Sequence, residues 1–547
     1  MAFYIRNGKG NLLMKKTLAV LLGLMLMLAC LPATMASAEQ TFTFASSNDL
    51  TTLDVSLMND EMSGLVMYAV HEGLIRHEKG EVVMGIAESY DISEDGLVYT
   101  FHLRDAKWAD GQPVVAGDFV YSFLRTMNPE TGSSQVESFE AIAGAAAYYN
   151  GETDDASTVG VSAPDDKTFV ITMESPNPFF IEEMARGINF YPIREDYVEQ
   201  YGAEYASEPS KFIGCGPFVL TEWVQTASLT MEKNPEYWDA DSIMLDKVVE
   251  LIVGDENTAT GMYDLGDVDA LYSISLTQTL NYPDFKSKET GSTLQYLAFM
   301  SEEGSVLDNQ NLRLALSYGI NRQAIVGALA SPGTDVADRV ILDSQTLEGE
   351  SIAAQYPASN GVPAEGDMEQ AKAYLAAALE ELGLADASAL PEIRYVAMES
   401  TTHKAMAEAL QAQWAQNLGV NVQIDIRPVP QAIGALLSGD FDIFLVSQST
   451  GVDPNTILGN FTIDNGNNYP HWSNQEYTDL IAEQVHEADL AKRFTALASA
   501  EQIILDEGAI APLWVPGGAY VVQDYVDGLY FGPWTGGIEF IHVTIAE

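Results

Sequence analysis

The sequence predicts an α/β protein of several domains, and three observations support this fold class. The chain has 547 residues, which corresponds to about three domains of ordinary size. Apolar residues make up 47% of the chain and charged residues 19%, a composition that can form large buried cores. Strand and helix patterns alternate along the chain with short connections, and this alternation is typical of sheets covered by helices.

The chain is strongly acidic. It carries 26 Lys and Arg against 79 Asp and Glu, a formal net charge of −53. Such a charge repels a nucleic-acid backbone and an anionic membrane surface, so we expect neither as a partner. A solvated acidic surface explains the charge, and recruitment of a cationic ligand is the alternative.

The N-terminus predicts export. Lys15 and Lys16 precede an apolar run over residues 18–28, and the small residues Ala36 and Ala38 follow. This order is typical of a signal peptide, which we place at residues 1–38. The run is too short for a membrane span, and no later stretch reaches the roughly 20 apolar residues that a spanning helix needs. We expect an extracellular, cell-surface or periplasmic protein.

The two cysteines leave one question about the N-terminus open. Cys30 follows Leu28 and Ala29, which resembles a lipobox whose cysteine is acylated after cleavage. Secretion after cleavage near Ala38 and lipid anchoring through Cys30 are therefore both retained. In either case Cys215 is left without a disulfide partner, so the fold must be stabilised by its cores.

Local patterns predict individual elements in both halves. Residues 97–103 alternate apolar and polar side chains as a half-buried strand does, and residues 118–125 have the apolar spacing of a helix. In the second half we expect two helices, over 368–383 and 402–419, the latter ending at a glycine that favours the left-handed cap. A strand over 420–426, a helix over 430–438 and a strand over 441–446 follow. Residues 281–292 and 331–366 are typical of loops that pass between substructures.

Common catalytic and metal-binding motifs are absent. The sequence contains no G-x-S-x-G, no phosphate-binding G-x-x-x-x-G-K, no H-E-x-x-H and no C-x-x-C, and its seven histidines are scattered. Gly214, Cys215 and Gly216 precede Pro217, which favours a tight backbone crossing over a nucleotide loop. A hydrolase with two catalytic carboxylates stays open, because the separation of such groups is a property of the folded chain.

Residues 86–125 carry a family resemblance. The stretch TFHLRDAKWADGQPVVAGDFVYSFLR at 100–125, with IAESY at 86–90, resembles the signature of the bacterial family 5 extracellular solute-binding proteins, which are peptide, dipeptide and nickel receptors of ABC importers. Further segments resemble the family in the same order along the chain. These are residues 53–54, 71–74, 216–218, 233–238, 311–322, 417–420, 439–442 and 526–529.

The resemblance implies a two-lobed clamp of the periplasmic-binding-protein type, class II, with an additional domain on the first lobe. The expected parts are lobe I, an additional domain at 73–205 and lobe II at 301–510. Lobe I would combine residues 39–72, 206–300 and 511–547. The signature itself has an expected structural role, in which Trp108 and the Asp110-Gly111 turn fix a hairpin and Asp118 lies near the start of a helix.

The resemblance also implies a function. A small-molecule or oligopeptide ligand would be trapped between the lobes and delivered to the membrane subunits of an ABC permease. We expect no catalysis, no cofactor, no metal and a monomer that meets the membrane only through the permease or a lipid anchor. A secreted hydrolase and a signalling receptor on the same clamp are the alternatives.

Two groups of candidate ligand-binding residues follow. In peptide receptors of the family, an aspartate before an Asp/Glu-Pro pair holds the ligand ammonium; here that place falls on Thr450, with Ser447 and Gln448 nearby. An uncharged threonine cannot form the charge-assisted bond that an ammonium favours. Another acid must then supply the charge, and we expect it in the segment after residue 54. The candidates in that segment are Asn59, Asp60 and Glu61, and the aromatic candidates near the last crossing are Trp514 and Tyr520.

Overall fold

The computed structural model describes residues 39–288, 291–347, 349–357, 361–485, 487, 489–532 and 537–546. The chain from Gln40 onward forms one compact unit. Cys30 and the expected signal peptide lie outside the described residues. Among the residues described, no helix is long and apolar enough to cross a membrane.

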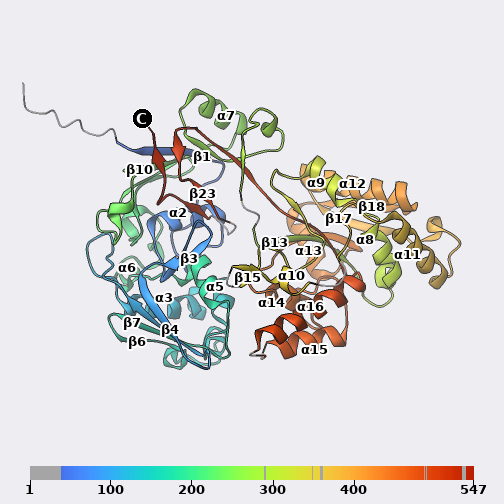
Figure 1. The fold of residues 1–547 in the computed structure, drawn as a ribbon, viewed down its shortest axis with the longest axis horizontal. Helices are drawn as coiled ribbons and strands as arrows, with labels where there is room; N and C mark the ends of the chain where they lie inside the picture. The colour runs from blue at the N-terminus through green and yellow to red at the C-terminus, as the bar shows by residue number, and fades with distance from the viewer. Residues whose placement is uncertain are drawn as a thin grey trace, which may run out of the picture. The chain divides into compact units, whose positions relative to one another are not determined.

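A seven-stranded sheet has the N-terminal strand in its interior. Strand β1 pairs in parallel with β10 on one side and with β11 on the other. The two faces of β1 pack in different cores. Phe42 and Phe44 lie in the core that contains helix α2 (Glu61–Val70), and Ala45 lies in the core that contains helix α7 (Glu256–Leu265) (Figure 1). In sheet order the strands are β12 (Lys286–Ser287), β21 (Ala519–Val522), β11 (Ala270–Ile274), β1 (Thr41–Ser46), β10 (Lys247–Ile252), β9 (Ser228–Lys233) and β8 (Phe218–Val224).

A six-stranded sheet is buried on both faces. Alternate residues of β13 enter two different cores, Leu294 and Tyr296 on one face and Leu297 and Phe299 on the other. In sheet order the strands are β14 (Asp335–Val336), β20 (Ile510–Val515), β13 (Thr293–Phe299), β19 (Ile443–Ser449), β17 (Ile393–Met398) and β18 (Val422–Arg427). The surrounding helices are α8 (Gln310–Tyr318), α9 (Arg322–Leu329), α11 (Met368–Glu381), α12 (Thr401–Leu418), α13 (Val429–Ser438), α15 (Gln475–Gln484) and α16 (Leu490–Asp506).

The helices and strands expected in the second half are confirmed as α11, α12, β18, α13 and β19. Gly419 and Gly439 end α12 and α13 in left-handed conformation, with φ of 70° and 72°, where a side chain would be strained. Not every apolar residue of β18 is buried, since Ile426 is 39% exposed. β18 is the edge strand of the six-stranded sheet, so side chains near its end are only partly covered by neighbouring elements.

A third, four-stranded sheet is antiparallel. It is made of β4 (Ala87–Ile92), β5 (Val98–Leu103), β7 (Thr168–Thr172) and β6 (Val161–Asp165), and α3 (Ala116–Met127) packs on it (Figure 1). The rings of Phe119 and Phe123 on α3 lie 5.6 and 5.3 Å from that of Phe169 on β7. The strand and helix expected at 97–103 and 118–125 are therefore confirmed.

Further short helices and strands lie along the described chain. Those near the four-stranded sheet are β2 (Ile75–Glu78), β3 (Glu81–Met84), α4 (Ala145–Tyr149), α5 (Phe180–Arg186) and α6 (Glu195–Tyr201). Those later in the chain are β15 (Thr346–Leu347), β16 (Glu350–Ser351), α10 (Ile352–Gln355), α14 (Asn455–Leu458), β22 (Val526–Asp527), β23 (Tyr530–Phe531), β24 (Ile538–Glu539) and β25 (Thr544–Ile545).

The chain passes between the two large sheets twice. The first connection, residues 288–292, joins β12 to β13, and the second connection, residues 516–518, joins β20 to β21. The two connections are bonded to each other, since the Lys288 N–H donates to the Gly518 carbonyl at 2.8 Å. These changes of sheet lie a few residues away from the lobe boundaries expected at 300 and 510. Because β13 and β20 pair with each other in the six-stranded sheet, we propose the two connections as the boundaries.

The signature at 86–125 has the structural role expected for it. The Trp108 indole is fully buried and its N–H donates to Asp118 Oδ2 at 3.1 Å. The same oxygen accepts from the Val115 N–H at 3.0 Å, at the start of α3. The Gly111 N–H donates to the Trp108 carbonyl at 2.8 Å and closes the turn.

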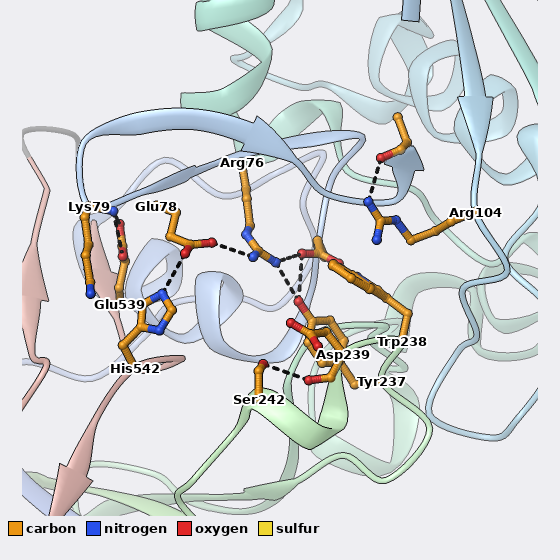
Figure 2. Close-up of polar contacts among 12 residues, drawn as sticks. Arg76, Glu78, Lys79, Arg104, Tyr237, Trp238, Asp239, Ser242, Glu539 and His542 are labelled. Carbon is orange, nitrogen blue, oxygen red and sulfur yellow. Dashed lines mark hydrogen bonds and ion pairs between the residues drawn. The ribbon is translucent and has the colours of Figure 1, made fainter. Parts of the chain in front are cut away.

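A partly buried arginine, Arg76, joins the β2–β3 hairpin to the segment after β9 (Figure 2). Arg76 Nη1 lies 2.6 Å from Glu72 Oε1 and donates to the Tyr237 hydroxyl at 2.7 Å, while Nη2 lies 2.8 Å from Glu78 Oε2. The Trp238 indole N–H donates to the other Glu72 oxygen at 2.5 Å. Because each charged group has a partner of opposite sign, the cluster can be buried without an isolated charge.

The C-terminal segment is bonded to the same hairpin. The Lys79 N–H donates to both carboxylate oxygens of Glu539, at 2.9 and 3.0 Å, and His542 Nε2 lies 2.8 Å from Glu78 Oε1 (Figure 2). Burial raises the pKa of Glu539 to about 7, although the Lys79 N–H opposes this shift. Burial also acts on Glu78, but hydrogen bonds from Arg76 and His542 hold its pKa below the ordinary value.

Cys215 is a core residue whose nearest titratable neighbour comes from a distant part of the chain. Its Sγ lies 3.1 Å from Nδ1 of His71, and the other ring nitrogen of His71 bonds to the Pro192 carbonyl at 2.8 Å. Burial lowers the pKa of His71 to about 4 and raises that of the Cys215 thiol well above its usual range. The pair is therefore neutral. The expected backbone crossing at this point is confirmed, because a side chain on Gly214 would lie 1.9 Å from the Val70 carbonyl oxygen.

Glu539→Gln is expected to stabilise the protein at pH 8 by about 1–3 kcal/mol and to have little effect near pH 4. A carboxyl whose pKa is raised on folding contributes stability below its unfolded pKa, and that stability is lost as the pH rises through about 7. Unfolding in denaturant at the two pH values measures the difference. Glu78→Gln is the control of opposite sign: its lowered pKa predicts a loss of stability at pH 8 that diminishes on acidification.

Cys215 should resist alkylation in the folded protein, because its thiol is buried and its thiolate disfavoured. Iodoacetamide at pH 8, followed by mass spectrometry of the peptide that contains Cys215, should find modification only after unfolding in guanidinium. Fast modification of the native protein would contradict the neutral pair with His71.

Candidate ligand-binding site

A cavity of about 710 Å³ lies where parallel strands of the seven-stranded sheet end. Strands β10 and β11 lie on opposite sides of β1, all three are parallel, and α7 connects β10 to β11. The carboxyl ends of parallel strands, at a point where neighbouring connections diverge, are the usual place for a ligand in α/β sheets. Residues of both connections also line the cavity, so it adjoins the passage between the two large sheets.

Helix α2 places Glu61 at the cavity. Asp60 is the N-cap of the helix and accepts from the Ser63 N–H at 2.9 Å, so its carboxylate serves the helix end. Glu61, in the first turn, lines the cavity and accepts from the Tyr272 hydroxyl at 2.5 Å. Burial, with the neighbouring Glu61 carboxylate, raises the pKa of Tyr272. The hydroxyl therefore remains a donor at every physiological pH.

Lys288 faces Glu61 from the first connection. Its Nζ lies 3.9 Å from Glu61 Oε1, 3.3 Å from the centre of the Tyr272 ring and 5.0 Å from that of Phe531. A cation over aromatic faces is attracted by their negative π surface. Burial lowers the pKa of Lys288 to about 8, and Glu61 opposes that shift.

Two further carboxylates lie at or behind the cavity wall. Glu256 at the start of α7 lines the cavity and accepts from the Ser275 N–H at 2.6 Å. Glu250 on β10 is buried behind Ser46, whose hydroxyl donates to it at 2.5 Å, and burial raises the pKa of Glu250 to about 7. Among the charged side chains that the structure describes on the wall, two are acids and one is a base.

The candidates on β19 and after it lie outside the lining. Thr450 is fully buried, and its N–H donates at 2.7 Å to the carbonyl of Ser292, which does line the cavity. Ser447 is exposed and pairs with Gln295 of β13. Gln448 accepts from the Tyr296 hydroxyl at 2.8 Å. These three residues adjoin the first connection and stay predictions as ligand contacts.

The aromatic candidates are packed in the cores. Trp514 is 2% exposed and its N–H donates to Gln295 at 2.6 Å. Tyr520 is 6% exposed, and its ring lies 4.2 Å from that of Phe531, a lining residue. Asn59 is exposed and does not line the cavity. All eight candidates are described, and Glu61 alone among them lines the cavity.

Sequence reasoning missed Tyr272, Lys288 and Phe531. Lys288 lies within the expected connecting loop at 281–292, and a lysine in such a loop was a signal that could have been used. Tyr272 and Phe531 gave no signal, because they join Glu61 only through pairing of distant strands.

The described residues contain no group of three or more His, Cys, Asp or Glu side chains that could hold a metal ion. The chemical resources of the cavity are therefore one cation, carboxylates, hydroxyls and aromatic rings. Such a site can hold a polar organic molecule through charge and hydrogen bonds.

Comparison with known proteins supports this interpretation. The oligopeptide-binding protein OppA of Bacillus subtilis is 31% identical over 500 residues, 89% of each chain. The substrate-binding domain of an oligopeptide ABC transporter from Bacillus anthracis superposes with a TM-score of 0.74 at 27% identity, over 93% of this chain and 99% of that one. Listeria monocytogenes OppA bound to peptide gives 0.72 at 26% identity, over 93% and 100%.

These likenesses confirm the predicted α/β clamp as the fold class and a solute-binding receptor as the class of function. The family model described as "Bacterial extracellular solute-binding proteins, family 5 Middle" matches residues 81–469. The chain belongs to family 5 of the bacterial extracellular solute-binding proteins.

Proposed function

We propose that this chain is the exported substrate-binding receptor of an ABC importer and that it binds a peptide or peptide-like solute in the cavity between β1, α2 and the two connections. The observation that carries the proposal is the position of the cavity, at the carboxyl ends of three parallel strands and beside both passages between the large sheets. The relatives named for oligopeptides, one of them described as bound to peptide, support the ligand class.

The two connections give a physical basis for transport signalling. A ligand that contacts both the seven-stranded sheet and the connections favours the arrangement in which all these contacts are made at once. Small changes of backbone angle at Lys288, Gly291 and Ser292 and in residues 516–518 would alter how the two sheets face each other. A permease could then distinguish the loaded receptor from the empty one.

Glu61 is the acid that we assign to a ligand ammonium. Thr450, at the place where peptide receptors of the family carry an aspartate, is uncharged and fully buried. Glu61 is 53% exposed at its side chain and lies in the cavity, so it can meet a ligand that enters from solvent. The Tyr272 hydroxyl holds one of its oxygens and leaves the other for the ligand.

We also propose that the protein binds its ligand without cleaving it. The alternative hydrolase would need two carboxylates set about the scissile bond, and Glu61 and Glu256 are the acids among the described lining residues. Each accepts a hydrogen bond from the protein, Glu61 from a tyrosine and Glu256 from a backbone amide. These bonds hold both carboxylates in place as hydrogen-bond acceptors. The ligand should therefore leave the protein unchanged.

Export, anchoring and assembly belong to the same proposal. We infer an exported monomer that meets the membrane through the permease or through acylated Cys30. A signalling receptor would share the cavity and differ in its partner, so a peptide-dependent transport defect in a deletion strain separates the two.

The decisive experiment is mass spectrometry of what copurifies with the protein under native conditions, followed by calorimetry with the identified molecule. A peptide recovered intact after prolonged incubation supports the receptor. Recovery of cleaved products, formed in proportion to protein and time, would establish the hydrolase instead.

Glu61→Gln should weaken binding of a ligand with a free ammonium by about 1.5–3 kcal/mol, because a charge-assisted hydrogen bond becomes a neutral one. Calorimetry on the wild type and the variant measures the change. Glu152→Gln removes the same charge from an exposed position in the additional domain and should leave affinity unaltered. Equal affinities of wild type and Glu61→Gln would remove Glu61 from the site.

A further inference from the structure

Glu250 is a buried carboxyl beside the cavity wall, and one of its two oxygens is left unbonded. The residue is 1% exposed, and Oε2 is shielded from solvent without a hydrogen-bond partner among the described residues. Its register neighbours on the adjacent strands are the core residues Phe44 on β1 and Leu229 on β9. A carboxyl in such surroundings destabilises the fold. Its presence therefore points to a role at the cavity.

Ser46 lies between Glu250 and the cavity. It ends β1, lines the cavity and donates its hydroxyl hydrogen to Glu250 Oε1 at 2.5 Å. The Asn48 carbonyl, at 3.3 Å, is the more distant acceptor for the same hydrogen. A hydroxyl has one hydrogen and two lone pairs, whereas an ionised carboxylate can only accept. While Glu250 is ionised, the serine hydrogen is therefore held by the protein, and the lone pairs of Ser46 Oγ are available to a ligand.

We propose that Glu250 is a positioning residue, which fixes the Ser46 hydroxyl as an acceptor for an N–H group of the ligand, so that binding favours ionised Glu250. The inference rests on the proposed function and extends it, since it links ligand binding to a proton. A protonated Glu250 is itself a donor and can occupy the Ser46 oxygen, which leaves the serine hydrogen for the Asn48 carbonyl. The same cavity then offers the ligand one acceptor fewer.

Glu250 changes its charge within the physiological pH range. Burial and the nearby Asp49 carboxylate raise its pKa to about 7, and the hydrogen bond from Ser46 opposes that shift. A ligand that selects the ionised form causes the release of the Glu250 proton, so its affinity increases as the pH rises through about 7. The titratable groups around Glu250 are Asp49, Tyr272 and, on the cavity side of Tyr272, Glu61 and Lys288.

The test measures how strongly the whole chain retains a random tripeptide library at pH 5.5 and at pH 7, with mass spectrometry of the bound peptides. The library omits histidine, so the peptides carry no side chain with a pKa near 6.5. Their α-amino groups, and Lys288 with its pKa of about 8, stay largely protonated in this range. Wild type should retain the library about three- to tenfold more strongly at pH 7 than at pH 5.5.

Three variants assign this pH dependence to its source. Glu250→Gln keeps the shape of the side chain without the ionisable group, and Ser46→Ala lacks the hydroxyl, so each should retain the library equally at the two pH values. Both should bind it more weakly than the wild type does at pH 7. Glu539→Gln is the matched control, because Glu539 is another buried carboxyl with a pKa of about 7 and does not line the cavity. This variant should keep the wild-type ratio.

Proton release gives a second readout, which a purely structural role of Glu250 would not produce. Calorimetry of one retained tripeptide at pH 6.5, in two buffers of different ionisation enthalpy, measures the protons exchanged on binding. Wild type and Glu539→Gln should release up to about one proton, and Glu250→Gln should release none.

The contrary outcomes separate the inference from the proposed function. Equal retention by the wild type at both pH values overturns the role of Glu250 and leaves the peptide receptor standing. A pH dependence that persists in Glu250→Gln or Ser46→Ala, or disappears in Glu539→Gln, overturns that role too, because another group then carries the proton. Failure of the wild type to retain any peptide overturns the receptor and the inference together. Ser46→Ala keeps the test decisive if Glu250→Gln does not fold, since it removes the contact and leaves the carboxyl in place.

Discussion

The parallel pairing of β1 between β10 and β11 is the constraint on which the rest of the structure depends. Two strands can pair in parallel only if the chain crosses over between them. The segment between β1 and β10, and helix α7 between β10 and β11, are these crossover connections. Because the three strands are parallel neighbours, their carboxyl ends lie at one edge of the sheet. The cavity forms at this edge because the connections diverge from it.

Much of the fold could be predicted from local signals. Asp110-Gly111 marked a turn, Gly419 marked a helix end, and residues 97–103 showed the alternation of a strand with one buried face. Sheet membership could not be predicted in this way. Strand β13 is buried on both faces, and a strand without alternation carries no information about which sheet pairs with it. The expected lobe boundary at 300 therefore differs from the change of sheet at residues 288–292.

The site was harder to predict than the fold, for a related reason. Glu61 could be named because it lies in a segment that the family resemblance points to. Tyr272 and Lys288 meet it across separations of more than 200 residues, which no spacing rule covers. Trp514 and Tyr520 were chosen as aromatic residues near the second connection, but whether an aromatic ring faces a cavity or a core depends on packing that sequence does not show.

The bonds between the C-terminal segment and the β2–β3 hairpin have a consequence for the order of assembly. Glu539 lies 460 residues after Lys79 along the chain, and His542 lies 464 residues after Glu78. Pairing such remote segments is slow, because most of the loop between them must be closed first. The contact with the hairpin can therefore form only after the residues between the two segments have been synthesised. A chain interrupted before β24 would leave Glu78 and Lys79 without these partners.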